Sequence, residues 1–200
     1  MGWGLAAWGP NTLAAPRPAR ILVLGDSLSA EYGLPRGTGW VALLQKRLSS
    51  RAQVQVINAS ISGETTSGGV TRLPALLKQH RPTHVVLELG ANDALRGLPI
   101  RATHGNLSRL ARQSREAGAQ VVLVGMMLPP NFGKRYAEDF AAIYPQVAKA
   151  ESAKVVPFFL KGVGDRADAR DWFQADGIHP LPKAHPIMLD NVWQALGPLL

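Results

Sequence analysis

Five short runs rich in branched aliphatic residues alternate along the chain with segments of helical periodicity. The runs occupy residues 21–24, 54–58, 84–89, 121–126 and 155–158. Most are continuously apolar, as in strands that are buried on both faces of a parallel sheet. This alternation predicts an α/β fold, a three-layer α/β/α sandwich with a five-stranded parallel sheet.

The segments between the runs place apolar residues three and four positions apart, which is the spacing of one helix face. The predicted faces are Trp40, Leu43, Leu44, Arg47 and Leu48; Leu107, Leu110 and Ala111; Phe140, Ile143, Tyr144, Val147 and Ala148; and Leu189, Val192, Trp193 and Leu196. Residues 67–79 are expected to be helical as well. Pro74 must then kink this helix or lie near its start, because proline disrupts a helix interior.

The length of 200 residues and the hydrophobic content of 46% suit a single domain, which we place at residues 20–200. Residues 1–19 differ in composition and resemble a degraded or truncated signal peptide, without its basic start, or else a disordered tail. The signal interpretation predicts a periplasmic protein, and the tail interpretation a cytoplasmic one. No apolar run approaches the ~18 to 20 residues of a membrane span, so we expect a soluble protein without stable membrane insertion.

The chain is basic and contains no cysteine. It has 22 Lys and Arg against 14 Asp and Glu, for a formal net charge of +8. The basic residues are scattered, with no run longer than a pair, whereas nucleic-acid-binding proteins tend to cluster them. We therefore expect no nucleic-acid partner. The absence of cysteine excludes disulfides, thiolate metal sites and a cysteine nucleophile.

Polar residues follow four of the predicted strands, where ligands bind in folds of this class. They lie in the segments GDSLS, NASISGETTSGG, GANDALRG and DGIHP. Ser27, His179 and Asp176 are of the types needed for a nucleophile, its base and the group that orients the base. Taken singly, each has an ordinary structural explanation, but together they predict a catalytic site.

An acyl-transfer site also needs hydrogen-bond donors for the developing oxyanion. We predict three: the backbone N–H of Ser27 at the start of a helix, the backbone N–H of Gly63, and the side-chain amide of Asn92. The alternative for Asn92 is that it only caps the helix after the third strand.

These four segments resemble the signatures of the SGNH or GDSL hydrolase family, which are named for a Ser, a Gly, an Asn and a His. The matching residues here are Ser27, Gly63, Asn92 and His179, with Asp176 completing the triad, and the resemblance spans residues 20–200. It implies a flavodoxin-like SGNH hydrolase fold. Asp26 and Asp93 would then be structural, binding loop and helix amides, rather than a glycosidase pair.

Within this family the sequence is similar to the multifunctional periplasmic acyl-CoA thioesterases, arylesterases and lysophospholipases of Gram-negative bacteria. The similarity implies a monomeric serine hydrolase of acyl esters and thioesters, through an acyl-enzyme, without metal or cofactor. The sequence departs from this group at Ala91 and Met127, where glycine and arginine are expected. Losing that arginine removes a cation near the expected substrate path.

Four apolar loop residues are candidates for lining an acyl groove, although they are equally compatible with loop core. They are Leu95, Leu98, Met126 and Met127. Two other functions remain open from the sequence. One is a carbohydrate-directed acetylesterase of the same superfamily, and the other is a non-catalytic module that binds anions or nucleic acid through the net positive charge.

Overall fold

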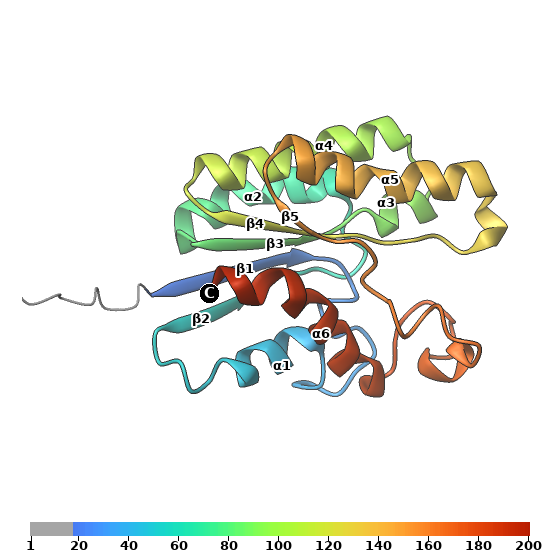
Figure 1. Ribbon diagram of the computed structural model, residues 1–200, viewed down its shortest axis with the longest axis horizontal. Helices are drawn as coiled ribbons and strands as arrows, with labels where there is room; N and C mark the ends of the chain where they lie inside the picture. Colours follow the sequence, from blue (N-terminus) through green and yellow to red (C-terminus); the bar gives the residue numbers. More distant parts are fainter. Residues whose placement is uncertain (1–17) are drawn as a thin grey trace, which may run out of the picture.

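The computed structural model describes residues 18–200, as five strands alternating with helices (Figure 1). The strands and α-helices are β1 (Ala19–Gly25), α1 (Trp40–Arg47), β2 (Val54–Asn58), α2 (Thr66–His80), β3 (His84–Glu88), α3 (Ala91–Leu95), α4 (Ile100–Glu116), β4 (Gln120–Val124), α5 (Lys134–Ala150), β5 (Lys154–Val156) and α6 (His185–Leu196). Short 3₁₀ helices cover Pro130–Phe132, Ala169–Trp172, Pro182–Ala184 and Gly197–Leu199.

The five strands form one parallel sheet in the order β2-β1-β3-β4-β5. Helices α1 and α6 cover one face, and α2, α4 and α5 cover the other (Figure 1). The predicted three-layer α/β/α sandwich with a five-stranded parallel sheet is confirmed. The direction of winding reverses between β1 and β3, and such a reversal opens a crevice at the carboxyl ends of the two strands.

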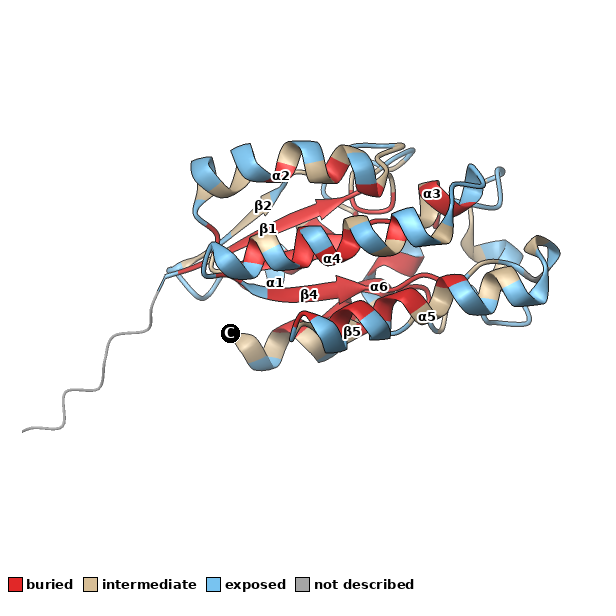
Figure 2. Cartoon of the chain, turned by 90° about the horizontal axis from the view of Figure 1, so that it is seen from above, coloured by how far each residue is buried: buried red, intermediate tan, exposed pale blue. Residues whose placement is uncertain are grey.

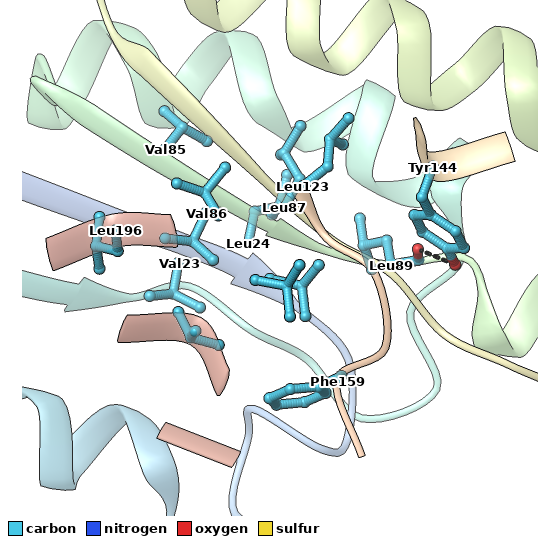
Figure 3. Packing of buried hydrophobic residues seen from close by; sticks show 14 of the residues in the cluster. Val23, Leu24, Val85, Val86, Leu87, Leu89, Leu123, Tyr144, Phe159 and Leu196 are labelled. Atoms are coloured by element: carbon cyan, nitrogen blue, oxygen red, sulfur yellow. Dashed lines mark hydrogen bonds between the residues drawn. The ribbon is translucent and has the colours of Figure 1, made fainter. Parts of the chain in front are cut away.

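The buried surfaces follow the periodicity of the sequence. The central strands β1, β3 and β4 are buried along most of their length, whereas each helix buries only the stripe that faces the sheet (Figure 2). Val23, Leu87 and Leu123 from these strands pack together in the core (Figure 3). The predicted faces of α4 and α5 are entirely buried.

The predicted faces of α1 and α6 include two residues that are not fully buried. Arg47 of α1 is exposed, whereas Trp193 of α6 is partly buried against the core, and the guanidinium of Arg47 lies 5.3 Å from the centre of the Trp193 ring. Arg47 also donates to Asp190 at 2.6 Å. These two residues therefore join α1 to α6 at the surface rather than within the core.

The structure corrects two details of the predicted elements. Pro74 is inside the 15-residue helix α2, so the alternative that it lies near the helix start is wrong, and the helix forgoes one backbone hydrogen bond there. Ser27 begins a turn rather than a helix, since α1 starts only at Trp40. The prediction of a signal peptide or tail at residues 1–19 falls almost wholly outside the described residues.

Strand β3 is linked to helix α5 immediately before the segment that carries Asn92. The buried hydroxyl of Tyr144 donates to the backbone carbonyl of Leu89 at 3.1 Å (Figure 3). The next residue, Gly90, has a φ of +118°, a conformation that side chains rarely adopt. A Cβ at Gly90 would lie 2.6 Å from the Tyr144 hydroxyl. Only glycine fits this turn without displacing Tyr144.

We predict that Gly90→Ala lowers the free energy of unfolding by about 1 to 3 kcal/mol, because it combines backbone strain with this close contact. Urea unfolding monitored by circular dichroism measures the change. Gly105→Ala is the matched control, since Gly105 is within α4 and a Cβ there meets nothing within 4 Å. The control should gain stability. Equal stability of Gly90→Ala and the wild type would contradict the prediction.

Candidate active site

Three of the predicted site residues form a continuous hydrogen-bonded chain at the carboxyl edge of the sheet. The distance from Ser27 Oγ to His179 Nε2 is 2.9 Å, and that from His179 Nδ1 to Asp176 Oδ2 is 2.7 Å. Ser27 follows β1, whereas Asp176 and His179 come from the long segment between β5 and α6. A serine, a base and an orienting carboxylate at these distances have the geometry required for nucleophilic catalysis.

Asp176 is held in its charged form. Its carboxylate accepts hydrogen bonds from the His179 ring and from the backbone N–H groups of Ile178 and His179. These bonds, the His179 ring first, lower the pKa of Asp176 to about 2. Because Asp176 stays ionised, it accepts a hydrogen bond from the Nδ1–H group of His179, which leaves Nε2 free to accept a proton from Ser27.

The segment before His179 must cross the sheet to reach Ser27, because β5 is the edge strand and β1 is three positions away. Its path is fixed by backbone pairing. Phe159 N donates to Gly125 O at 2.8 Å just after β5. Phe173 and Pro180 then form an antiparallel bridge that closes the turn containing Asp176 and His179.

Two residues that the sequence analysis did not single out hold His179 in place. The Tyr32 ring lies against the His179 ring, with centroids 4.4 Å apart and planes tilted by 39°. Gln174 Nε2 donates to the backbone carbonyl of Tyr32 at 2.9 Å, which ties the turn after β1 to the segment that carries His179. No sequence pattern indicated these contacts, since both residues lie in irregular segments.

The two predicted backbone donors are unengaged. Within residues 18–200, neither the N–H of Ser27 nor that of Gly63 donates to another group of the protein. Gly63 has a φ of +78°, which suits glycine. Its carbonyl accepts from the Arg96 guanidinium at 2.9 Å. The N–H of Ser27 belongs to a turn, so the expected contribution of a helix start does not arise.

Asn92 is the second residue of α3, and it does not cap this helix. The N-cap is Gly90, and no side chain caps it, so the capping alternative is wrong. Instead, Asn92 Nδ2 donates to Asp26 Oδ2 and to the backbone carbonyl of Glu64, both at 3.1 Å. These contacts place Asn92 beside the residues that adjoin Ser27 and Gly63. An oxyanion could bind Nδ2 only by displacing one of these two acceptors.

Asp26 and Asp93, two further carboxylates of these motifs, have structural partners. Asp26 Oδ1 accepts from the N–H of Leu28 at 3.0 Å. Asp93 accepts from the backbone N–H and the hydroxyl of Thr66 at the start of α2. The predicted hydrogen bonding to loop and helix amides is therefore confirmed for both residues.

Exposed apolar side chains concentrate at this edge of the sheet. In the described part of the chain, every large apolar side chain classed as exposed lies in a segment that follows a strand. These residues are Tyr32, Ile61, Leu95, Leu98, Met127 and Ile178. Among the four candidate groove residues, Met126 is buried in the core, which favours the loop-core alternative for it. Met127 lines a groove of about 620 Å³ along β5 and α6 that does not include the triad.

The described residues contain no group of three or more His, Cys, Asp or Glu side chains arranged to hold a metal ion. No helix among them is long and apolar enough to cross a membrane.

The chain is similar to known proteins in both sequence and fold. Residues 23–187 match the model of the GDSL-like lipase/acylhydrolase family. The chain is 51% identical to Esterase TesA of Pseudomonas aeruginosa, over 90% of this chain and 89% of that protein. It is 42% identical to thioesterase 1/protease 1/lysophospholipase L1 of Escherichia coli K12, over 94% and 88%. The crystal structure of TesA superposes with a TM-score of 0.86 at 51% identity, covering 90% of this chain and 99% of that one.

We predict that Asp176→Asn lowers kcat by as much as about 10⁴-fold while the protein stays folded, because the amide favours the wrong tautomer of His179. Ester hydrolysis and thermal melting measure the two effects. Asp168→Asn is the matched control: Asp168 lies in the same segment, and its pKa is also lowered to about 2, in this case by Arg166. It should keep wild-type turnover. Wild-type turnover in Asp176→Asn would exclude Asp176 as the orienting group.

Asn92→Ala should lower kcat by roughly 10² to 10³-fold with little change in KM, because a bond to the oxyanion strengthens only as charge develops. Initial rates over a range of substrate concentrations separate the two constants. Melting temperature provides the control for folding. If the variant melts much earlier but keeps its turnover per folded molecule, Asn92 is a structural residue only.

Proposed function

The chain belongs to the GDSL-like lipase/acylhydrolase family, and from this premise we propose that it is a serine hydrolase that cleaves acyl esters and thioesters. The observation that carries the proposal is the hydrogen-bonded chain from Ser27 through His179 to Asp176. Its relatives are named as an esterase and as a thioesterase and lysophospholipase. We extend those activities to this protein, with arylesters, acyl-CoA and lysophospholipids as its substrate classes.

In the first half of the reaction, Ser27 Oγ attacks the carbonyl carbon while His179 Nε2 takes the hydroxyl proton. The carbonyl oxygen becomes an oxyanion that accepts from the N–H groups of Ser27 and Gly63 and from Asn92 Nδ2. The intermediate then collapses and breaks the bond to the leaving alcohol or thiol, which receives the proton from His179. The product of this half is the acyl-enzyme.

In the second half, His179 takes a proton from water as the water oxygen attacks the acyl carbon. The same donors stabilise the second oxyanion, and the proton returns to Ser27 Oγ as the free acid leaves.

All groups in the cycle come from a single chain, in keeping with a monomeric enzyme. We propose the periplasm as its compartment, on the resemblance of residues 1–19 to an incomplete signal peptide.

The apolar residues around the site support an acyl chain rather than a sugar as the bound group. Six large apolar side chains are exposed in the segments that follow the strands. Of these, Tyr32 lies against the His179 ring, and Ile178 precedes His179 in the chain. Covering such side chains with a hydrocarbon releases about 25 cal/mol for each Å² removed from water. We propose that Leu95 and Leu98 contact the acyl chain, together with Tyr32, Ile61 and Ile178. Met127 is a secondary candidate, whereas the buried Met126 belongs to the core.

The decisive experiment measures hydrolysis of arylesters and acyl-CoA thioesters graded by chain length, together with an acetylated xylan. We expect kcat/KM to rise from acetyl to medium-chain esters and to be low on the xylan.

A fluorophosphonate probe should label Ser27, and Ser27→Ala should lose both labelling and hydrolysis. Ser60→Ala is the control, since the Ser60 hydroxyl has no hydrogen-bond partner among the described residues. Undiminished labelling of Ser27→Ala would place the nucleophile elsewhere, and preference for the xylan would favour the carbohydrate esterase.

A further inference from the structure

Two carboxyl groups are buried near two of the proposed oxyanion donors, since Asp26 precedes Ser27 and binds Asn92, and Glu88 contacts Asp26. Asp26 is 1% exposed at the end of β1, and Glu88 is 2% exposed at the end of β3. Glu88 Oε2 accepts from Ser29 Oγ at 2.7 Å and from the backbone N–H of Asp26 at 3.3 Å. The sequence analysis did not single out Glu88, although a charged residue directly after the apolar residues 85–87 was the available signal.

This pair has no cationic partner on either side. Neither carboxyl forms a salt bridge to Lys or Arg within residues 18–200. Two neighbouring buried carboxylates cannot both carry a charge without compensation, so the pair retains one proton. Burial and the charge of Asp26 raise the pKa of Glu88 well above its usual range, whereas burial raises that of Asp26 only to about 6. Glu88 therefore holds the proton, and Asp26 carries the charge at neutral pH.

The charge on Asp26 decides which acceptor Asn92 keeps. Asn92 Nδ2 donates to the charged Asp26 carboxylate and to the neutral Glu64 carbonyl at the same distance of 3.1 Å. Hydrogen bonds to a charged acceptor are roughly twice as strong as those to a neutral one. An arriving oxyanion should therefore displace the Glu64 carbonyl and leave the bond to Asp26 intact.

We propose that Asp26 is a positioning residue that holds one N–H of Asn92 and thereby aims the other at the oxyanion, with the protonated Glu88 keeping Asp26 in its charged form. This inference rests on the proposed function. A carboxylate can only accept hydrogen bonds, so it also fixes the amide orientation of Asn92, with nitrogen rather than oxygen toward the site. Asp26 acts only through Asn92 and does not touch the substrate.

Protonation of Asp26 would weaken this control at acid pH. The groups that face Asp26 are Glu88 from β3, His179 from the segment before α6, and Tyr144 from α5, which also faces Asp93 of α3. Tyr144 is neutral, since burial raises its pKa well above the usual range. The pKa of Asp26 is about 6 in the folded state against 3.8 ordinarily. The folded protein thus binds this proton more tightly, and ionising Asp26 costs stability as the pH rises from about 4 to about 6.

Asp26→Asn tests the proposal because it removes the charge while preserving shape. We expect kcat to fall by about 10 to 100-fold with KM within about twofold, and melting at pH 8 to be no lower than in the wild type. Rates are normalised to the Ser27 that a fluorophosphonate labels at completion. Asp93→Asn is the matched control: it is buried, adjacent to Asn92 in sequence, and bound to Thr66 instead. Its normalised kcat should stay within about twofold of the wild type.

A double-mutant cycle separates positioning from a merely structural role. If Asp26 acts through Asn92, then Asp26→Asn should have almost no further effect in the Asn92→Ala background. Effects that multiply would overturn the proposal. Unchanged kcat in Asp26→Asn would do the same. Ser27→Ala separates failure of the proposed function from failure of the positioning role. If Ser27→Ala retains hydrolysis, the proposed function is wrong. If Ser27→Ala is inactive but the effects of Asp26→Asn and Asn92→Ala multiply, only the positioning role of Asp26 is wrong.

The pH profile supplies an independent readout. In the wild type, the acid limb of kcat/KM includes a contribution from the protonation of Asp26. In Asn92→Ala the state of Asp26 no longer matters, so its acid limb should be shallower. Acid limbs of equal steepness in the two proteins would show that protonating Asp26 does not act through Asn92.

Discussion

The parallel pairing of β1 with β3 is the constraint on which the site depends. These two strands are neighbours in the sheet although β2 separates them in the sequence. Their carboxyl ends bring Asp26 and Ser27 beside Glu88 and Asn92. Because both strands are buried on both faces, apolar packing fixes the register of their pairing, in which Gly25 lies opposite Glu88. The proposed oxyanion donors Ser27 and Asn92 therefore lie just beyond strands that are fixed in the core of the protein.

The same burial makes it costly to charge the two carboxyl groups at the ends of these strands. Asp26 and Glu88 are removed from water without a cation, which is costly unless they share a proton and fill their hydrogen bonds. Ser29, Leu28 and Asn92 supply those bonds. Asp176 is the contrasting case: it is more exposed and bound by several donors, so its charge is easily kept. Asp26 and Asp176 both follow a predicted strand in the sequence, and it is their different burial that gives them different electrostatic environments.

Much of this arrangement follows from local patterns. Apolar runs predicted the five strands, and the spacing of Phe140 and Tyr144 predicted a buried helix face that the structure contains. Errors arose where a local signal competed with tertiary contacts. Ser27 was expected at a helix start, but the chain forms a turn there and delays α1 until Trp40. Asn92 was open to interpretation as a cap, but Asp26 and the Glu64 carbonyl are its actual partners.

The sequence by itself determined the layers of the fold and the residue types available at the carboxyl ends of the strands, because periodicity and strand order along the chain are local properties. Only the tertiary structure decided which of these residues meet. His179 follows the edge strand β5 and reaches Ser27 through backbone pairing around Phe173 and Pro180. The contacts of Tyr32, Gln174 and Glu88 likewise form only when segments distant in the chain come together. Such contacts join residues far apart in the chain, and no short-range pattern encodes them.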